Sequence, residues 1–119
     1  MTFFQYAQIL LVVTMIAAGQ LLFQKSAADS PPLSTLAGMT SLITNPVFIL
    51  ALIIYGVATL LWVAVLQQVP LSRAYPFNAL GFILVPAAAI VFYGEAATIR
   101  LFVGLALVVI GLIVVGGRG

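Results

Sequence analysis

The chain alternates long apolar stretches with short polar breaks. A helix that crosses the hydrocarbon core of a bilayer needs about 20 apolar residues at a rise of about 1.5 Å each. Continuous apolar runs favour helices over barrel strands, which alternate in polarity, and lipid does not tolerate unpaired backbone groups. The sequence therefore predicts an all-α integral membrane protein, one domain over 1–119, with four transmembrane helices at about 3–24, 47–67, 74–93 and 98–117.

The longest connection, 25–46, contains its own helical pattern. Ser30, followed by Pro31 and Pro32, suits a helix N-cap with proline in the first turn. Apolar and small polar residues then follow at helical spacing, which predicts a short interfacial helix at 32–44 that Asn45-Pro46 ends. A disordered polar loop is the alternative.

Composition agrees with a membrane protein and excludes several functions. The residues are 65% hydrophobic and 5% charged, far from the balance of soluble domains. The chain has no cysteine and no histidine, no nucleophile beside a base and no paired carboxylates, so we expect no metal site, no cofactor and no enzyme. The basic residues are scattered, which predicts no nucleic-acid binding. The six charged residues are Lys25, Asp29, Arg73, Glu95, Arg100 and Arg118.

Polar residues within the apolar stretches indicate which faces turn inward. Gln20 and Gln24 are four residues apart and share a helix face. Tyr55, Thr59 and Trp62 form one stripe on the second helix, which we expect to line the bundle interior, although ordinary packing with Trp62 as an interfacial anchor is the alternative.

Two further features concern packing rather than chemistry. Gly104 and Gly111 lie seven residues apart on one face of the fourth helix, which favours close approach of another helix. Pro86 lies within the third helix and predicts a kink there.

Several of these segments together resemble the drug/metabolite transporter superfamily with its EamA-type repeats. The matching residues are Pro70 before the third helix, Pro86 within it, Gly94-Glu95 at its end, and Gly104 and Gly111 in the fourth. The resemblance implies a four-helix bundle like that of the small multidrug-resistance proteins.

The match is best with the small subunits of the Arn-type aminoarabinose-phosphoundecaprenol flippase. It rests on Ala18-Gly19-Gln20-Leu21 with Lys25, Trp62 with Val65-Leu66-Gln67-Gln68-Val69-Pro70, Ala74-Tyr75-Pro76, and the glycine spacing of the fourth helix. The resemblance implies a multi-pass subunit of the bacterial inner membrane that works as a dimer and moves an undecaprenyl-phosphate-linked aminosugar across the bilayer.

One departure separates the chain from the multidrug exporters of this superfamily. Those relatives use a carboxylate within the first helix to exchange protons for cationic drugs, whereas 12–18 contains no acid here. Glu95 does not replace it simply, because it ends the third helix near Arg100, with which we expect an interfacial ion pair.

A lipid-linked sugar requires cations for its phosphate and amide or aromatic groups for its sugar. Lys and Arg near helix ends also serve as membrane anchors, which is the alternative for the two cations. The candidate substrate-binding residues are Gln20, Gln24, Lys25, Tyr55, Trp62, Arg73, Tyr75 and Asn78.

Charge also bears on assembly. With four spans, Arg73 and both termini share one membrane side and Lys25 and Arg100 the other, so basic residues balance two against two. The positive-inside rule then sets no orientation. We expect a homodimer, with antiparallel pairing permitted, or a heterodimer with a similar small subunit.

Two other functions remain open at this stage. The chain could be an exporter of small metabolites or cations, or a non-transporting membrane subunit that scaffolds a glycosyltransferase. Movement of the lipid by purified protein in liposomes would separate these from a flippase.

Overall fold

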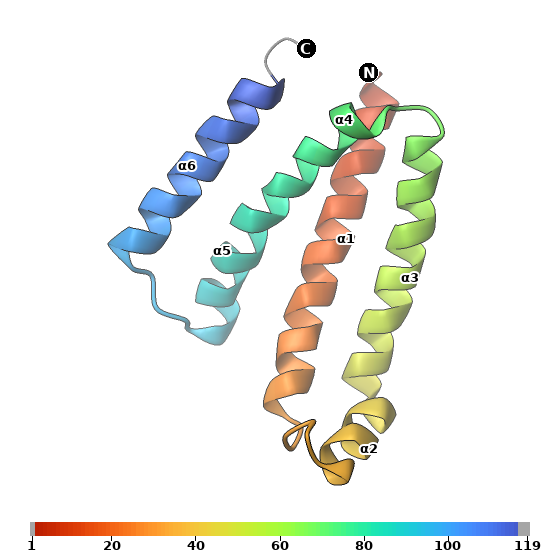
Figure 1. Ribbon diagram of the computed structural model, residues 1–119, viewed down its shortest axis with the longest axis vertical. Coiled ribbons are helices and arrows are strands. Elements are labelled where there is room, and N and C mark those ends of the chain that lie inside the picture. The colour runs from red at the N-terminus through yellow and green to blue at the C-terminus, as the bar shows by residue number, and fades with distance from the viewer. Residues whose placement is uncertain (1, 117–119) are drawn as a thin grey trace.

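The computed structural model describes residues 2–116, and within them every regular element is helical. The prediction of an all-α chain is thereby confirmed. Figure 1 shows α1 (Phe3–Ala28) flanked by α3 (Pro46–Leu66) and by α5 (Gly81–Tyr93), with α6 (Ile99–Gly116) outermost. The start of α1 and the end of α6 lie at the same end of the bundle.

Three helical segments are long and apolar enough to cross a membrane: Phe3–Ala28, Pro46–Leu66 and Leu71–Tyr93. A fourth apolar helix, Ile99–Val115, is shorter. The fourth predicted span, 98–117, corresponds to this helix, and its last residue lies outside the described residues.

The first helix begins with a capping box. Thr2 Oγ1 accepts from the Gln5 backbone N–H at 3.2 Å, and Gln5 Oε1 accepts from the Thr2 N–H at 3.0 Å. These bonds pair backbone donors that a helix start leaves open. At its other end α1 continues to Ala28, four residues past the expected end at residue 24.

The long connection contains a short helix, α2 (Leu36–Thr44), whose start differs from the prediction. The N-cap is Thr35, not Ser30, because Thr35 Oγ1 accepts from the Gly38 N–H at 3.0 Å. Pro31 and Pro32 instead precede the helix, and Pro32 begins a turn that the Thr35 N–H closes on the Pro32 carbonyl at 3.1 Å. Location of α2 at the membrane interface stays a prediction.

The third span is not one regular helix. It consists of α4 (Leu71–Ala74), a 3-10 segment η1 (Tyr75–Leu80) and α5. Pro76 lies at the start of η1 and has no N–H to donate, so one hydrogen bond of a regular α-helix is missing there. The break in regular α-helix therefore lies at η1. α5 runs through Pro86 as one helix, and the predicted kink at Pro86 stays a prediction.

The buried core lies at the end of the bundle where α1 begins. Its residues come from α1, α3, the turn after α3 and α4, and they are Ile9, Val13, Val65, Val69 and Ala74. Trp62, Leu66, Phe77 and Leu80 pack against it. This core holds α3 and η1 against the first half of α1.

Much of the remaining apolar surface is exposed. On α6 the large exposed side chains are Ile99, Phe102, Val103, Leu107, Ile110, Ile113, Val114 and Val115. A Cβ added at Gly104 or Gly111 would meet no atom within 4 Å, so no described part of this chain packs closely on that face. Such a surface suits lipid or another membrane helix.

Candidate functional site

The structure divides the predicted site residues between the two ends of the bundle. Gln20, Gln24 and Lys25 lie near the end of α1, where Tyr55 of α3 joins them. Trp62, Arg73, Tyr75 and Asn78 belong to the opposite end, where α3 passes into α4 and η1.

At the first end, α1 and α3 meet through Tyr55. Gln20 Nε2 donates to the Tyr55 hydroxyl, and the Tyr55 ring lies 5.2 Å from the Phe23 ring. The ring reaches α1 because Gly19 has no side chain: a Cβ there would lie 2.6 Å from Tyr55 Cδ2. The Gln20 amide and the Tyr55 phenol therefore form one polar contact between two apolar helices.

On its other side α1 contacts the end of α5. Gln24 Nε2 donates to Glu95 Oε2, and the Tyr93 hydroxyl donates to the Leu21 carbonyl at 2.6 Å. We call Gln20, Gln24, Tyr55, Tyr93 and Glu95 the polar cluster. Tyr93 and Glu95 were not among the predicted site residues, although Gly94-Glu95 was recognised as the end of the helix.

The expected ion pair between Glu95 and Arg100 is wrong for the described residues, whose single ion pair joins Lys25 and Asp29. Gly94 explains the difference. It takes a left-handed conformation with φ of 66°, which suits glycine, and the following Glu95 N–H returns to the Ala89 carbonyl at 3.4 Å. This helix end turns Glu95 toward α1 and away from the start of α6.

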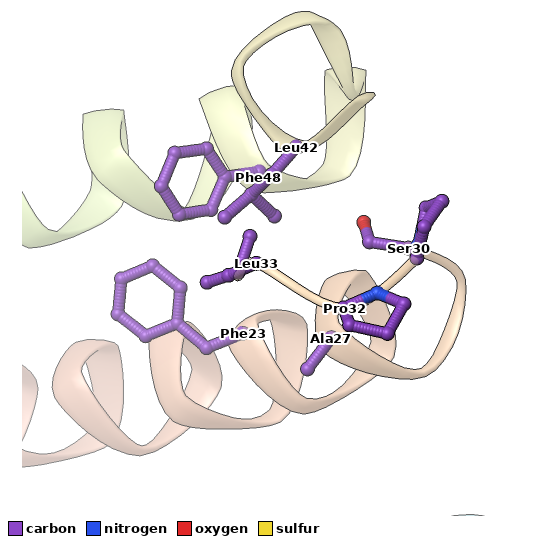
Figure 2. Close-up of a pocket in the computed structure, with 8 residues that line it drawn as sticks. Phe23, Ala27, Ser30, Pro32, Leu33, Leu42 and Phe48 are labelled. Atoms are coloured by element: carbon purple, nitrogen blue, oxygen red, sulfur yellow. The ribbon is translucent and has the colours of Figure 1, made fainter. Parts of the chain in front are cut away.

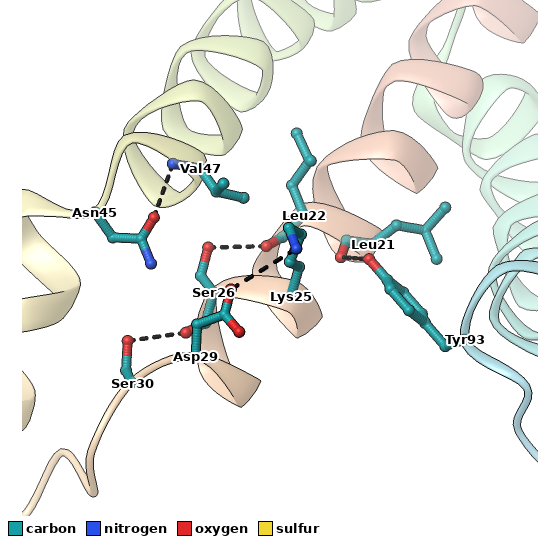
Figure 3. A network of polar contacts seen from close by, with 9 residues as sticks. All are labelled: Leu21, Leu22, Lys25, Ser26, Asp29, Ser30, Asn45, Val47 and Tyr93. Atoms are coloured by element: carbon teal, nitrogen blue, oxygen red, sulfur yellow. Dashed lines mark hydrogen bonds and ion pairs between the residues drawn. The ribbon is translucent and has the colours of Figure 1, made fainter.

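Lys25 has a weak partner. Its Nζ lies 3.8 Å from Asp29 Oδ2, one helical turn on, and the two side chains are 53% and 55% exposed. Exposed pairs of this kind contribute about 0–1 kcal/mol. Figure 3 shows this pair beside the Ser26 and Ser30 hydroxyls, which donate to backbone carbonyls of α1. The Lys25 ammonium can thus exchange Asp29 for another anion at little cost.

Next to this end lies an apolar pocket of about 460 Å³. Figure 2 shows Phe23 and Phe48 facing across it, with Leu33 between them. The lining residues come from α1, the connection, α2 and α3: Phe23, Ala27, Ser30, Pro31, Pro32, Leu33, Leu42 and Phe48. The pocket is large enough for several methylene or methyl groups, and its α1 lining residues, Phe23 and Ala27, lie two residues before and two residues after Lys25.

At the opposite end of the bundle, the side chains of the predicted residues form no hydrogen bonds with one another among the described residues. Trp62 packs on the core, whereas Arg73 and Tyr75 are exposed. Asn78 Oδ1 is buried and accepts no hydrogen bond from the residues that the structure describes, and the same holds for Gln8 Oε1, which sequence reasoning missed. Both oxygens are acceptors available to a donor.

The predicted stripe on α3 is only partly internal. Tyr55 and Trp62 are half-buried, but Thr59 between them is exposed and donates its hydroxyl to the Tyr55 carbonyl at 2.8 Å.

The described residues contain no group of three or more His, Cys, Asp or Glu side chains that could hold a metal ion. Amides, phenols, one carboxylate and nearby cations are groups that bind a polar, charged molecule.

No protein-family model and no solved structure matches the chain. Among curated proteins, it is 34% identical over 109 residues to the probable 4-amino-4-deoxy-L-arabinose-phosphoundecaprenol flippase subunit ArnE of Enterobacter sp. (strain 638), covering 92% of this chain and 94% of the relative.

Proteins of the same name from Yersinia pseudotuberculosis serotype O:1b (strain IP 31758) and Yersinia pestis (strain Pestoides F) are 45% identical over 64 residues. That match covers 54% of this chain and spans only 56% of the length of the Yersinia relatives.

Proposed function

The chain belongs to the family of ArnE flippase subunits, and we propose that it is a transporter subunit that moves an undecaprenyl-phosphate-linked aminosugar between the leaflets of the bacterial inner membrane. The observation that supports this most is the alignment with a relative of that name over 92% of the chain.

The substrate explains why a small apolar bundle would suffice. The polyprenyl tail can stay in lipid, whereas a charged headgroup at the bilayer centre costs several kcal/mol or more. The protein therefore has to shelter only the headgroup. The polar cluster offers amide and phenol groups beside α1, and the apolar pocket next to it suits the part of the tail nearest the phosphate.

Lys25 and Arg73 are the proposed phosphate ligands. Lys25 is held only by an exposed pair with Asp29, and Arg73 is exposed at the other end of the bundle. A charge-assisted hydrogen bond to phosphate is stronger than such a pair. One cation at each membrane surface would let the phosphate be received on either side.

A dimer would complete the enclosure. The four apolar segments leave wide faces exposed, including the open Gly104 and Gly111 face of α6. The partner is a second copy, in either relative orientation, or a similar small subunit. The substrate path then lies between two subunits.

Reconstitution tests the proposal. Vesicles would contain undecaprenyl-phosphate aminoarabinose, with the purified chain alone or with a similar small subunit from the same source. A membrane-impermeant amine reagent labels only the outer leaflet, so flipping raises the labelled fraction from about half toward completion. Labelling no faster than in protein-free vesicles, with and without the second subunit, would refute the proposal.

A further inference from the structure

The chain has only two acidic residues, Asp29 and Glu95, and their carboxylates have different partners. Asp29 is paired with Lys25 at 3.8 Å. Glu95 Oε2 accepts from the neutral Gln24 amide, and among the described residues no cation lies within ion-pair distance of this carboxylate. Glu95 is thus the acid whose charge the described residues leave uncompensated.

Glu95 is also held in place, although it is exposed. The left-handed Gly94 ends α5, and the Tyr93 hydroxyl ties that end to the Leu21 carbonyl of α1 at 2.6 Å. Gln24, three residues further along α1, then bonds one carboxylate oxygen. Within the described residues the other oxygen, Oε1, accepts no hydrogen bond and remains available to a donor.

The substrate named for the relatives carries two opposite charges. A 4-amino-4-deoxy sugar has an ammonium group, and its link to the polyprenyl chain is a phosphodiester. An ammonium removed from water needs an anion within a few ångströms, since an unpaired charge is costly in a low-dielectric site. Amides and phenols can bind a sugar hydroxyl, but only a carboxylate matches this charge.

We infer that Glu95, oriented by Gln24, is the residue of this subunit that recognises the ammonium group of the aminosugar. The inference rests on the proposed function and adds the basis of its selectivity for an amino over a neutral sugar. Figure 3 shows Lys25 and Tyr93 near the same end of α1, and Glu95 follows Tyr93 by two residues. The Lys25 ammonium and the Glu95 carboxylate are therefore both available at this end, one for the phosphate and one for the ammonium group of the headgroup.

The test compares two lipids that differ at the amine: undecaprenyl-phosphate aminoarabinose, which carries an ammonium group there, and its N-acetylated form, which carries a neutral and larger amide. Affinities are measured for the chain in nanodiscs, with its similar small subunit if transport requires it. Wild type should bind the amino lipid about tenfold or more tightly than the acetylated lipid, the range of a charge-assisted hydrogen bond. Glu95→Gln should abolish this preference and leave binding of the acetylated lipid unchanged, which also reports an intact fold.

Two further variants sharpen the result. Glu95→Asp should retain part of the preference, and Asp29→Asn should retain all of it, although it removes the same charge from the chain. Equal binding of both lipids by wild type, or an equal loss for both lipids in Glu95→Gln, would overturn the inference alone. Failure of wild type to bind either lipid would overturn the proposed function together with it.

Discussion

Replacing Gly19 with alanine tests the contact that brings the Tyr55 ring onto α1. The new Cβ would lie 2.6 Å from Cδ2 and 2.7 Å from Cε2 of Tyr55. Carbon atoms in ordinary contact are about 3.5–4.0 Å apart, so the ring or the helix must move by about 1 Å. That movement also displaces the hydroxyl that accepts from Gln20.

The size of the effect follows from two opposing terms. Overpacking costs roughly 1–3 kcal/mol, whereas alanine is favoured over glycine in a helix by about 1 kcal/mol. Gly56→Ala is the matched control, because Gly56 is also helical and a Cβ there would meet no atom of the described residues within 4 Å. The helix term is common to both variants, so Gly19→Ala should be less stable than Gly56→Ala by about 1–3 kcal/mol.

The assay is reversible unfolding in mixed micelles with increasing dodecyl sulfate, followed by circular dichroism and by the fluorescence of the single tryptophan, Trp62. In a Tyr55→Ala background the difference between the two variants should disappear, since the ring that causes the clash is gone. Equal stability of Gly19→Ala and Gly56→Ala, or an unchanged difference in that background, would refute the reasoning.

Three further results are expected. Lys25→Ala and Arg73→Ala should each weaken lipid binding to purified, dimeric protein by about 1–3 kcal/mol, with partial recovery in Lys25→Arg; unchanged binding in both alanine variants would make them membrane anchors. Gly104→Leu combined with Gly111→Leu should reduce crosslinked dimer in native membranes and keep the helix content, because each Cβ has open space in the described chain; undiminished crosslinking would place the dimer contact elsewhere. Cells expressing wild type or Glu95→Gln should take up cationic dyes at the background level, since the first helix has no acid at its centre, and robust proton-driven export by wild type would contradict this.

The sequence by itself determined the class of structure. Long apolar segments must be helical in lipid because their backbone groups have to bond within the segment. It also placed Gln20 and Gln24 on one helix face, because helical spacing is a local property, and the family resemblance marked Gly94-Glu95 as the end of the third helix, where the structure has it. The resemblance to Arn-type subunits was likewise readable from the residues, and the relatives confirm it.

Only the tertiary structure decided which of these groups meet. Glu95 bonds to Gln24, which is 71 positions away in the chain, and not to Arg100 close by, because the turn at Gly94 and the packing of α5 on α1 set the direction of its side chain. Tyr93 reaches the α1 backbone for the same reason. Spacing along one helix fixes which residues share a face, but the angle and depth at which two helices pack depend on side chains from both, as Gly19 and Tyr55 demonstrate.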